Sequence, residues 1–180
     1  EKDPVFKTYN AFREVFGEDG NLVFIGLEDE RIFTPETFEQ WRVFTGKLLE
    51  TPGITAAINV SNLGILSRDD TLRSFRMQQL FSGALPNQHE LDSLIAIAFD
   101  QPFYSYKLFN PESRALLTIV SLEHDILNTP GRVGLVNSIK DLGKNFSKET
   151  GIQLHYSGLP FIRTKTAKKI EDELLLFVIL

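Results

Sequence analysis

Apolar residues recur at helical spacing in four stretches of the chain, which predicts amphipathic helices over about residues 3–16, 34–51, 87–99 and 130–146. Asp3 with Pro4, Thr34 with Pro35, and Thr129 with Pro130 supply N-terminal caps and first-turn prolines. The residues predicted to face inward in the last three helices are Phe38, Trp41, Phe44, Thr45 and Leu48, then Leu91, Leu94, Ile95, Ala98 and Phe99, then Val133, Val136, Ile139, Leu142 and Phe146.

Five shorter segments have the patterns of strands. Residues 22–27 form a continuous apolar run, and residues 54–60 alternate with a period of two. Residues 103–109 and 115–122 are rich in aromatic and branched side chains and flank a turn-like segment at 110–113, which predicts a hairpin. Residues 152–156 alternate again, before Gly158 and Pro160 end the strand.

The order of these elements predicts one α+β domain. Two strand-helix-strand halves indicate a split βαβ, ferredoxin-like topology, with the helices on one face of a mostly antiparallel sheet. An insertion over about residues 62–114 carries the additional helix and part of the hairpin. In residues 61–85 neither the helical nor the strand periodicity dominates, and we expect this segment to be mostly irregular and to contain at most one short helix.

The composition is that of an ordinary globular domain: 180 residues, 42% apolar and 24% charged, with a net charge of −5. The basic residues are scattered, so the sequence predicts no nucleic-acid partner. Cysteine is absent, which excludes disulfides, thiolate metal sites and cysteine nucleophiles. The chain begins with Glu1 and carries no signal segment, which suggests a piece of a longer polypeptide.

The last seven residues, 174–180, are all apolar and follow a charged segment. A bilayer-spanning helix needs roughly 20 apolar residues. We therefore interpret 174–180 as the truncated start of a transmembrane helix, which an exit helix over 164–180 would enter, and residues 1–173 as a domain outside the membrane.

Several short motifs occur in an order that resembles a known family. They are Phe16-Gly17, residues 32–36 (Ile-Phe-Thr-Pro-Glu), residues 49–54 (Leu-Glu-Thr-Pro-Gly-Ile), Leu85-Pro86, residues 100–102 (Asp-Gln-Pro), residues 116–120 (Leu-Leu-Thr-Ile-Val) and residues 158–160 (Gly-Leu-Pro). In this order the chain resembles the first extracytoplasmic loop of resistance-nodulation-division (RND) exporters. The hydrophobe/amphiphile exporters, the mycobacterial large membrane proteins and Patched-like proteins are the similar branches.

The resemblance implies a periplasmic porter domain between the first two transmembrane helices of a proton-driven inner-membrane exporter of lipids or other amphiphiles. Its partners would be the membrane helices and second periplasmic loop of the same transporter, an amphiphilic substrate, and possible further copies in a homo-oligomer. In such exporters the proton-carrying acidic groups lie in membrane helices, so this domain would not pump alone.

No residue pattern predicts catalysis, a cofactor or a metal site. His89, His124 and His155 have no ligand spacing. The triplet Glu123-His124-Asp125 has the chemistry for a metal or for acid-base work, but is more simply the start of a loop. Ser138, Ser147 and Ser157 lack the Gly-x-Ser-x-Gly elbow, and no glycine-rich phosphate loop is present. The sequence therefore predicts a protein that is not an enzyme.

The aromatic residues Phe103, Tyr104, Tyr106 and Phe109 have two interpretations. They would either line a wall for an amphiphile or serve as core and cross-strand partners in the predicted hairpin. The sequence does not identify any substrate-binding residue.

Two other functions fit the same pattern. One is an extracytoplasmic sensor domain of a membrane receptor or kinase, which would also lie between two spans. The other is a soluble enzyme of ferredoxin-like topology, which would require a pocket with convergent titratable groups.

Overall fold

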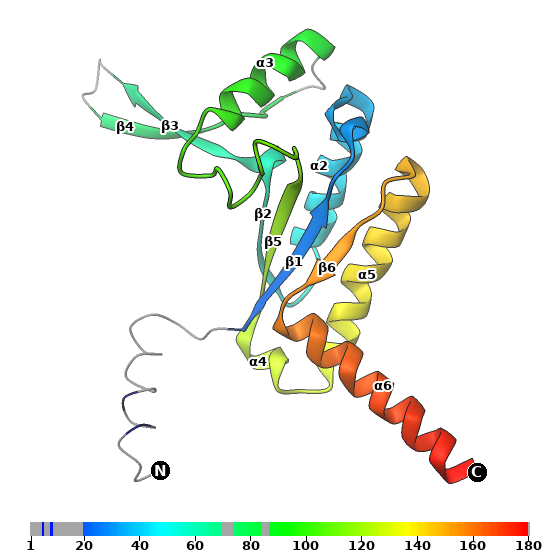
Figure 1. Ribbon diagram of the computed structural model, residues 1–180. Coiled ribbons are helices and arrows are strands. Elements are labelled where there is room, and N and C mark those ends of the chain that lie inside the picture. Colours follow the sequence, from blue (N-terminus) through cyan, green and yellow to red (C-terminus); the bar gives the residue numbers. More distant parts are fainter. Residues whose placement is uncertain (1–4, 6–7, 9–19, 70–73, 84–86, 180) are drawn as a thin grey trace.

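The computed structural model describes residues 5, 8, 20–69, 74–83 and 87–179 (Figure 1). Its centre is a four-stranded sheet of β1 (Leu22–Leu27), β2 (Ile54–Ile58), β5 (Leu116–Leu122) and β6 (His155–Ser157). The strand order is β2-β5-β1-β6, and every neighbouring pair is antiparallel. The helix predicted over residues 3–16 falls almost entirely outside the described residues.

The topology consists of two interlocked βαβ units. Helix α2 (Pro35–Leu49) connects β1 to β2, and β5 lies between those strands; helix α5 (Gly131–Thr150) connects β5 to β6, and β1 lies between them. The two helices lie side by side on one face of the sheet (Figure 1). The predicted α+β fold of ferredoxin-like type is therefore confirmed.

Helix α2 supplies the centre of the core. Thr34 is extended, Pro35 occupies the first turn, and the five residues predicted to face inward are all buried: Phe38, Trp41, Phe44, Thr45 and Leu48. The rings of Trp41 and Phe44 lie 5.3 Å and 5.5 Å, respectively, from the ring of Phe146 on α5. This aromatic cluster joins the two helices over the sheet.

Helix α5 lies unusually close to the edge strand β6. A Cβ added at Gly143 would lie 1.7 Å from the hydroxyl oxygen of Tyr156, so only glycine fits here. The ring of Tyr156 stacks on Phe161 at 5.5 Å, and burial raises the pKa of the Tyr156 hydroxyl to about 12. The edge strand is thus held between α5 and the start of α6 (Leu159–Ile179).

A buried polar network joins α2, β5 and the end of β2. Asn59, which is 0% exposed, donates from Nδ2 to the Oγ1 atoms of Thr45 (2.8 Å) and Thr118 (3.0 Å). Its Oδ1 accepts from the N–H and the hydroxyl of Ser61, at 2.8 Å and 2.7 Å. Thr45 in turn donates to the carbonyl of Trp41. Every hydrogen-bonding atom of the Asn59 amide is therefore partnered within the core.

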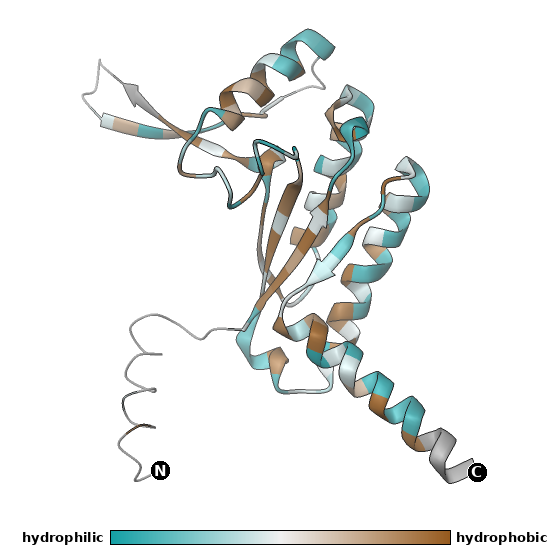
Figure 2. Cartoon of the chain, in the orientation of Figure 1, coloured by the Kyte–Doolittle hydropathy of each residue, from teal (hydrophilic) through white to brown (hydrophobic). Residues whose placement is uncertain are grey.

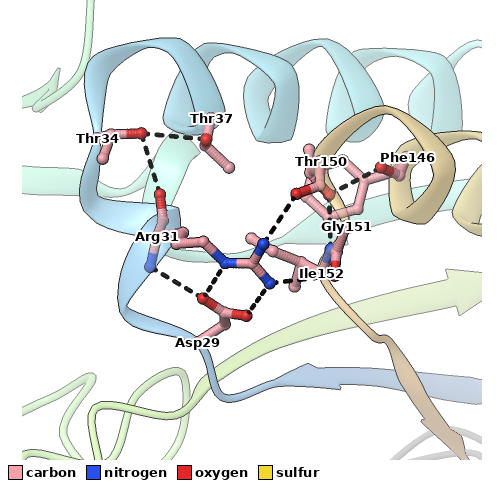
Figure 3. A network of polar contacts seen from close by, with 8 residues as sticks. All are labelled: Asp29, Arg31, Thr34, Thr37, Phe146, Thr150, Gly151 and Ile152. Carbon is pink, nitrogen blue, oxygen red and sulfur yellow. Dashed lines mark hydrogen bonds and ion pairs between the residues drawn. The ribbon is translucent and has the colours of Figure 1, made fainter.

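A second polar network fastens the chain before α2 to the end of α5 (Figure 3). Asp29 caps the 3-10 turn η1 (Glu30–Phe33) by accepting from the N–H of Arg31, and its carboxylate also binds the Arg31 guanidinium at 2.6 Å and 2.9 Å. The same guanidinium donates to the carbonyls of Thr150 and Gly151. The Arg31 guanidinium lowers the pKa of Asp29.

The insertion between β2 and β5 differs from the prediction for residues 61–85. These residues contain an antiparallel hairpin of β3 (Gly64–Asp69) and β4 (Ser74–Gln79), which projects from the body (Figure 1). All side chains of β4 are exposed. β4 does alternate, but only over Phe75 and Met77, whose side chains are both exposed. An alternation this short does not stand out in the sequence as a strand. The helix that follows, α3 (Gln88–Phe99), agrees with the prediction.

The hairpin predicted over 103–109 and 115–122 is wrong in its first half. β5 pairs with β1 along its whole length and with β2 only from Ile119 onward, which leaves room beside its first residues. There Phe109 forms a single antiparallel bridge with Leu116, and the N–H of Leu117 donates to the carbonyl of Leu108, but the pairing goes no further. Residues 103–109 instead form consecutive turns, in which the N–H of Leu108 donates to the carbonyl of Tyr104 and the N–H of Tyr106 donates to that of Phe109.

The C-terminal part of the chain shows smaller differences. The last strand is shorter at its start than predicted and pairs only from His155, which lies opposite Gly26. A short helix, α4 (His124–Leu127), occupies the segment expected to begin a loop.

Helix α6 begins five residues before the predicted exit helix and extends away from the body (Figure 1). Across the described residues, no helix combines the length and the apolar character that crossing a membrane requires.

We predict that Asn59→Ala lowers the free energy of unfolding by about 3 kcal/mol, because Thr118 and Ser61 lose their buried partner. Urea denaturation at neutral pH measures this. The control is Thr55→Ala, which removes an exposed hydroxyl bonded to the Ser121 carbonyl and is expected to change stability by less than about 1 kcal/mol. Equal stability of the two variants would contradict the role of Asn59.

We also predict that Asp29→Asn destabilises the protein at neutral pH and that the difference from the unchanged protein shrinks in acid. The pKa of Asp29 is lowered in the folded state, so its contribution is complete above the ordinary value of 3.8 and disappears as the pH falls through the lower folded-state pKa. Urea midpoints measured across this range test the prediction. In an Arg31→Gln background the substitution should have a smaller effect, and an unchanged effect would argue against the ion pair.

Candidate functional site

The two faces of the sheet differ in what covers them. Residues of β1 and β5 alternate between fully buried side chains under α2 and α5 and partly exposed ones on the opposite face. No helix of the described chain packs across that opposite face, which we call the open face. Figure 2 shows that β1 and β5 are nevertheless hydrophobic along most of their length. The open-face residues of the three strands β1, β2 and β5 are Leu22, Phe24, Gly26, Ala56, Ile58, Leu117, Ile119 and Ser121.

A bulge in β2 places Ile58 on the open face. The register between β2 and β5 shifts between Ile54 and Ala56, so Ala57 pairs with Val120 on the covered side and Ile58 pairs with Ile119 on the other. Ile58 is 47% exposed. Ile119 pairs in turn with Phe24, which completes an apolar row across three strands.

A hollow of about 330 Å³ adjoins this row at the end where β1 leaves the sheet. Gly26, Leu117 and His155 occupy neighbouring register positions in its floor, and Tyr106 and Phe109 contribute to its wall. A Cβ built on Gly26 would meet no atom closer than 4.0 Å. The absence of a side chain at Gly26 therefore helps to create the hollow.

Tyr106 is held in an uncommon conformation beside this hollow. Its φ angle is +58°, in the left-handed region that residues other than glycine seldom adopt. The N–H of Tyr106 donates to the carbonyl of Phe109 at 2.8 Å, and this bond closes the turn. Tyr106 is 69% exposed. Backbone strain of this kind is frequent at binding sites, where the surrounding structure maintains it.

The four aromatic residues singled out from the sequence therefore do not form one wall. Phe109 is buried and stacks on Phe99 at 4.3 Å, and Tyr104 donates its hydroxyl to the carbonyl of Gly64. Phe103 and Tyr106 are exposed. Of the four, only Tyr106 and Phe109 line the hollow. Residues 103–109 form no strand, and the cross-strand interpretation holds only for Phe109, which is a core residue and bridges Leu116 of β5.

Polar groups lie around the hollow but do not converge inside it. Glu28, Lys107 and His155 are among its lining residues. The Nζ atom of Lys107 donates to the carbonyl of Phe103 and lies 5.0 Å from the centre of that ring. An apolar floor with a few polar groups at its margin suits a molecule that is mainly hydrophobic.

The histidines and the acidic triplet are separated in space. His155 lines the hollow, His89 is in the first turn of α3, and His124 begins α4 with Glu123 as its N-cap. Among the described residues, no three potential ligands of a metal ion lie together.

Sequence reasoning missed Gly26, Ile58 and Leu117 as site residues. A glycine inside an apolar strand run was the one available signal, because such a glycine often marks a place that another molecule approaches. The exposure of Ile58 had no signal, since a bulge is not visible in an alternating pattern.

Comparison of the chain with protein-family models and with curated proteins finds no match.

We predict that Gly26→Val folds normally and weakens binding of the neutral hydrophobic probe N-phenyl-1-naphthylamine at least severalfold. Valine suits a strand and has room at this position, but its side chain would occupy the floor of the hollow. Fluorescence titration measures the change. The control is Gly46→Ala on α2, where an added Cβ meets nothing within 4 Å. Equal probe affinity in both variants would show that the hollow is not the binding site.

Proposed function

We propose that this chain is the periplasmic substrate-handling domain of a proton-driven exporter of the RND superfamily, located between the first two membrane helices of an inner-membrane protein. The observation that carries the proposal is a partly exposed apolar sheet face, with Ile58 as its most exposed residue and an adjoining hollow, on a ferredoxin-like domain. A monomeric soluble domain rarely leaves a continuous apolar surface exposed unless a ligand or partner uses it.

In this proposal the open face forms one wall of a cleft for a hydrophobic or amphiphilic molecule. The second periplasmic loop of the same transporter supplies the opposite wall, and the domain moves as a rigid body when the membrane part changes state. The packed aromatic cluster of α2 and α5 gives the domain the stiffness that such movement needs. The domain itself performs no catalysis in this scheme.

Helix α6 is the proposed mechanical connection to the membrane. From Lys165 to Leu174 it is exposed, and Ile170 and Leu174 are more than half exposed. From Leu174 onward its sequence is apolar at every position. A helix with no polar face is favoured by lipid or by a protein interior rather than by water.

We predict that Ile58→Asp reduces export of a hydrophobic dye by the full-length transporter at least severalfold, because it places a charge in the apolar row of the open face. Dye efflux from energised cells measures the change, with the amount of protein in the membrane checked by immunoblot. The control is Val43→Asp on α2, which is equally exposed at 47% but lies on the helical side.

Three results would contradict the proposal. The first is efflux that does not depend on the proton gradient, and the second is equal efflux in the Ile58 and Val43 variants. The third is a full-length gene product that lacks either of two expected apolar segments of roughly 20 residues, one before Glu1 and one that includes residues 174–180. A single cytoplasmic signalling module after the second apolar segment would instead indicate a sensor domain.

A further inference from the structure

A second hollow, of about 450 Å³, lies on the helical side of the domain between α2 and α3. Its volume falls in the range of about 300–1,000 Å³ that is usual for small-molecule sites. Its lining combines apolar residues from three parts of the chain, Phe38, Phe81 and Leu94, with polar ones, among them Arg42, His89 and Ser93. It shares no residue with the hollow on the open face.

The apolar part of this hollow is preformed. Phe38 is fully buried and Phe81 is 6% exposed, and their ring centres lie 4.8 Å apart. Leu94 is half-buried on the facing side of α3. Because the two rings hold each other in place, a hydrophobic ligand meets a fixed surface and orders few side chains when it binds.

Arg42 is the polar group that distinguishes the hollow. Its side chain is 25% exposed, and its Nη1 atom donates to the Glu39 carboxylate at 2.9 Å and to the carbonyl of Gly83 at 3.2 Å. Its Nε and Nη2 atoms donate to no other residue in the described part of the chain. These two atoms form the side of the guanidinium that binds a carboxylate through two parallel hydrogen bonds.

The remaining polar groups are compatible with an anion at Arg42. His89 and Ser82 add potential donors. Ser93 donates its hydroxyl to the carbonyl of His89. Glu90 also lines the hollow but is exposed and belongs to the first turn of α3, where the helix dipole favours a carboxylate. Glu39 accepts from Nη1 and so leaves the Nε–Nη2 edge of the guanidinium available.

We infer that the hollow between α2 and α3 binds a carboxylate-bearing amphiphile, such as a medium-chain fatty-acid anion. The acyl chain lies against Leu94 and the accessible edge of Phe81, which the buried ring of Phe38 supports from below, and the carboxylate binds the free edge of Arg42. This site is additional to the open face, and the inference does not depend on an export function.

Isothermal titration of the full chain with octanoate and with octan-1-ol tests the inference, because the two probes share the alkyl chain and differ in the head group. Octanoate is expected to bind roughly tenfold more tightly than octanol, because only its carboxylate can form charge-assisted hydrogen bonds with Arg42. Arg42→Gln should abolish this preference, and Arg42→Lys should restore only part of it.

Two further variants locate the site and keep the test informative if an Arg42 variant fails to fold. Ser93→Trp is expected to fill the hollow from its exposed rim and to weaken both probes. Lys107→Gln, which removes a cation at the other hollow, should leave octanoate affinity unchanged. The inference is overturned if the unchanged protein binds the two probes with equal affinity or shows no saturable heat on titration with octanoate. It is also overturned if the Lys107 variant loses octanoate binding, or if the Ser93 variant binds the probes as tightly as the unchanged protein.

Discussion

The buried amide of Asn59 is the interaction on which the arrangement of the domain depends. It lies where β2 ends and the insertion begins, and it connects Thr45 of α2, Thr118 of β5 and the backbone of Ser61. A buried side-chain amide without hydrogen-bond partners lowers the free energy of unfolding by several kcal/mol. The Asn59 amide has all its partners only when the three elements are in place together. Sheet, helix and exit point of the insertion are therefore specified by one side chain.

This constraint helps to explain the difference between the two sheet faces. Asn59 turns into the core immediately after Ile58, and the bulge earlier in β2 places Ala57 on the covered side. Ile58 must then face outward, although it is large and apolar. The apolar row through Ile119 and Phe24 follows from strand pairing, so the surface proposed for substrate contact results from the same packing that stabilises the core.

The two hollows have different chemistry because different elements form them. The hollow on the open face depends on a missing side chain at Gly26 and on the strained turn at Tyr106, and its polar groups are marginal. The hollow between α2 and α3 depends on the insertion, which brings Phe81 and α3 against Phe38 and Arg42. The insertion thus adds to a common βαβ framework a pocket that the framework alone does not contain.

The amphipathic spacing in the sequence was sufficient to predict α2, α3 and α5, because each of these helices buries one face and so leaves a period in the sequence. β1 was predicted from its continuous apolar run, and the order of the elements indicated the ferredoxin-like fold. In the β3–β4 hairpin the alternation is confined to Phe75 and Met77, which are exposed. The turns at 103–109 resembled a strand because their residues favour strands locally. Only tertiary structure decided these segments, the bulge that exposes Ile58 and the assembly of both hollows. The reason is physical: periodicity records whether a residue is buried, whereas pairing partners and cavities depend on contacts between residues far apart in the chain.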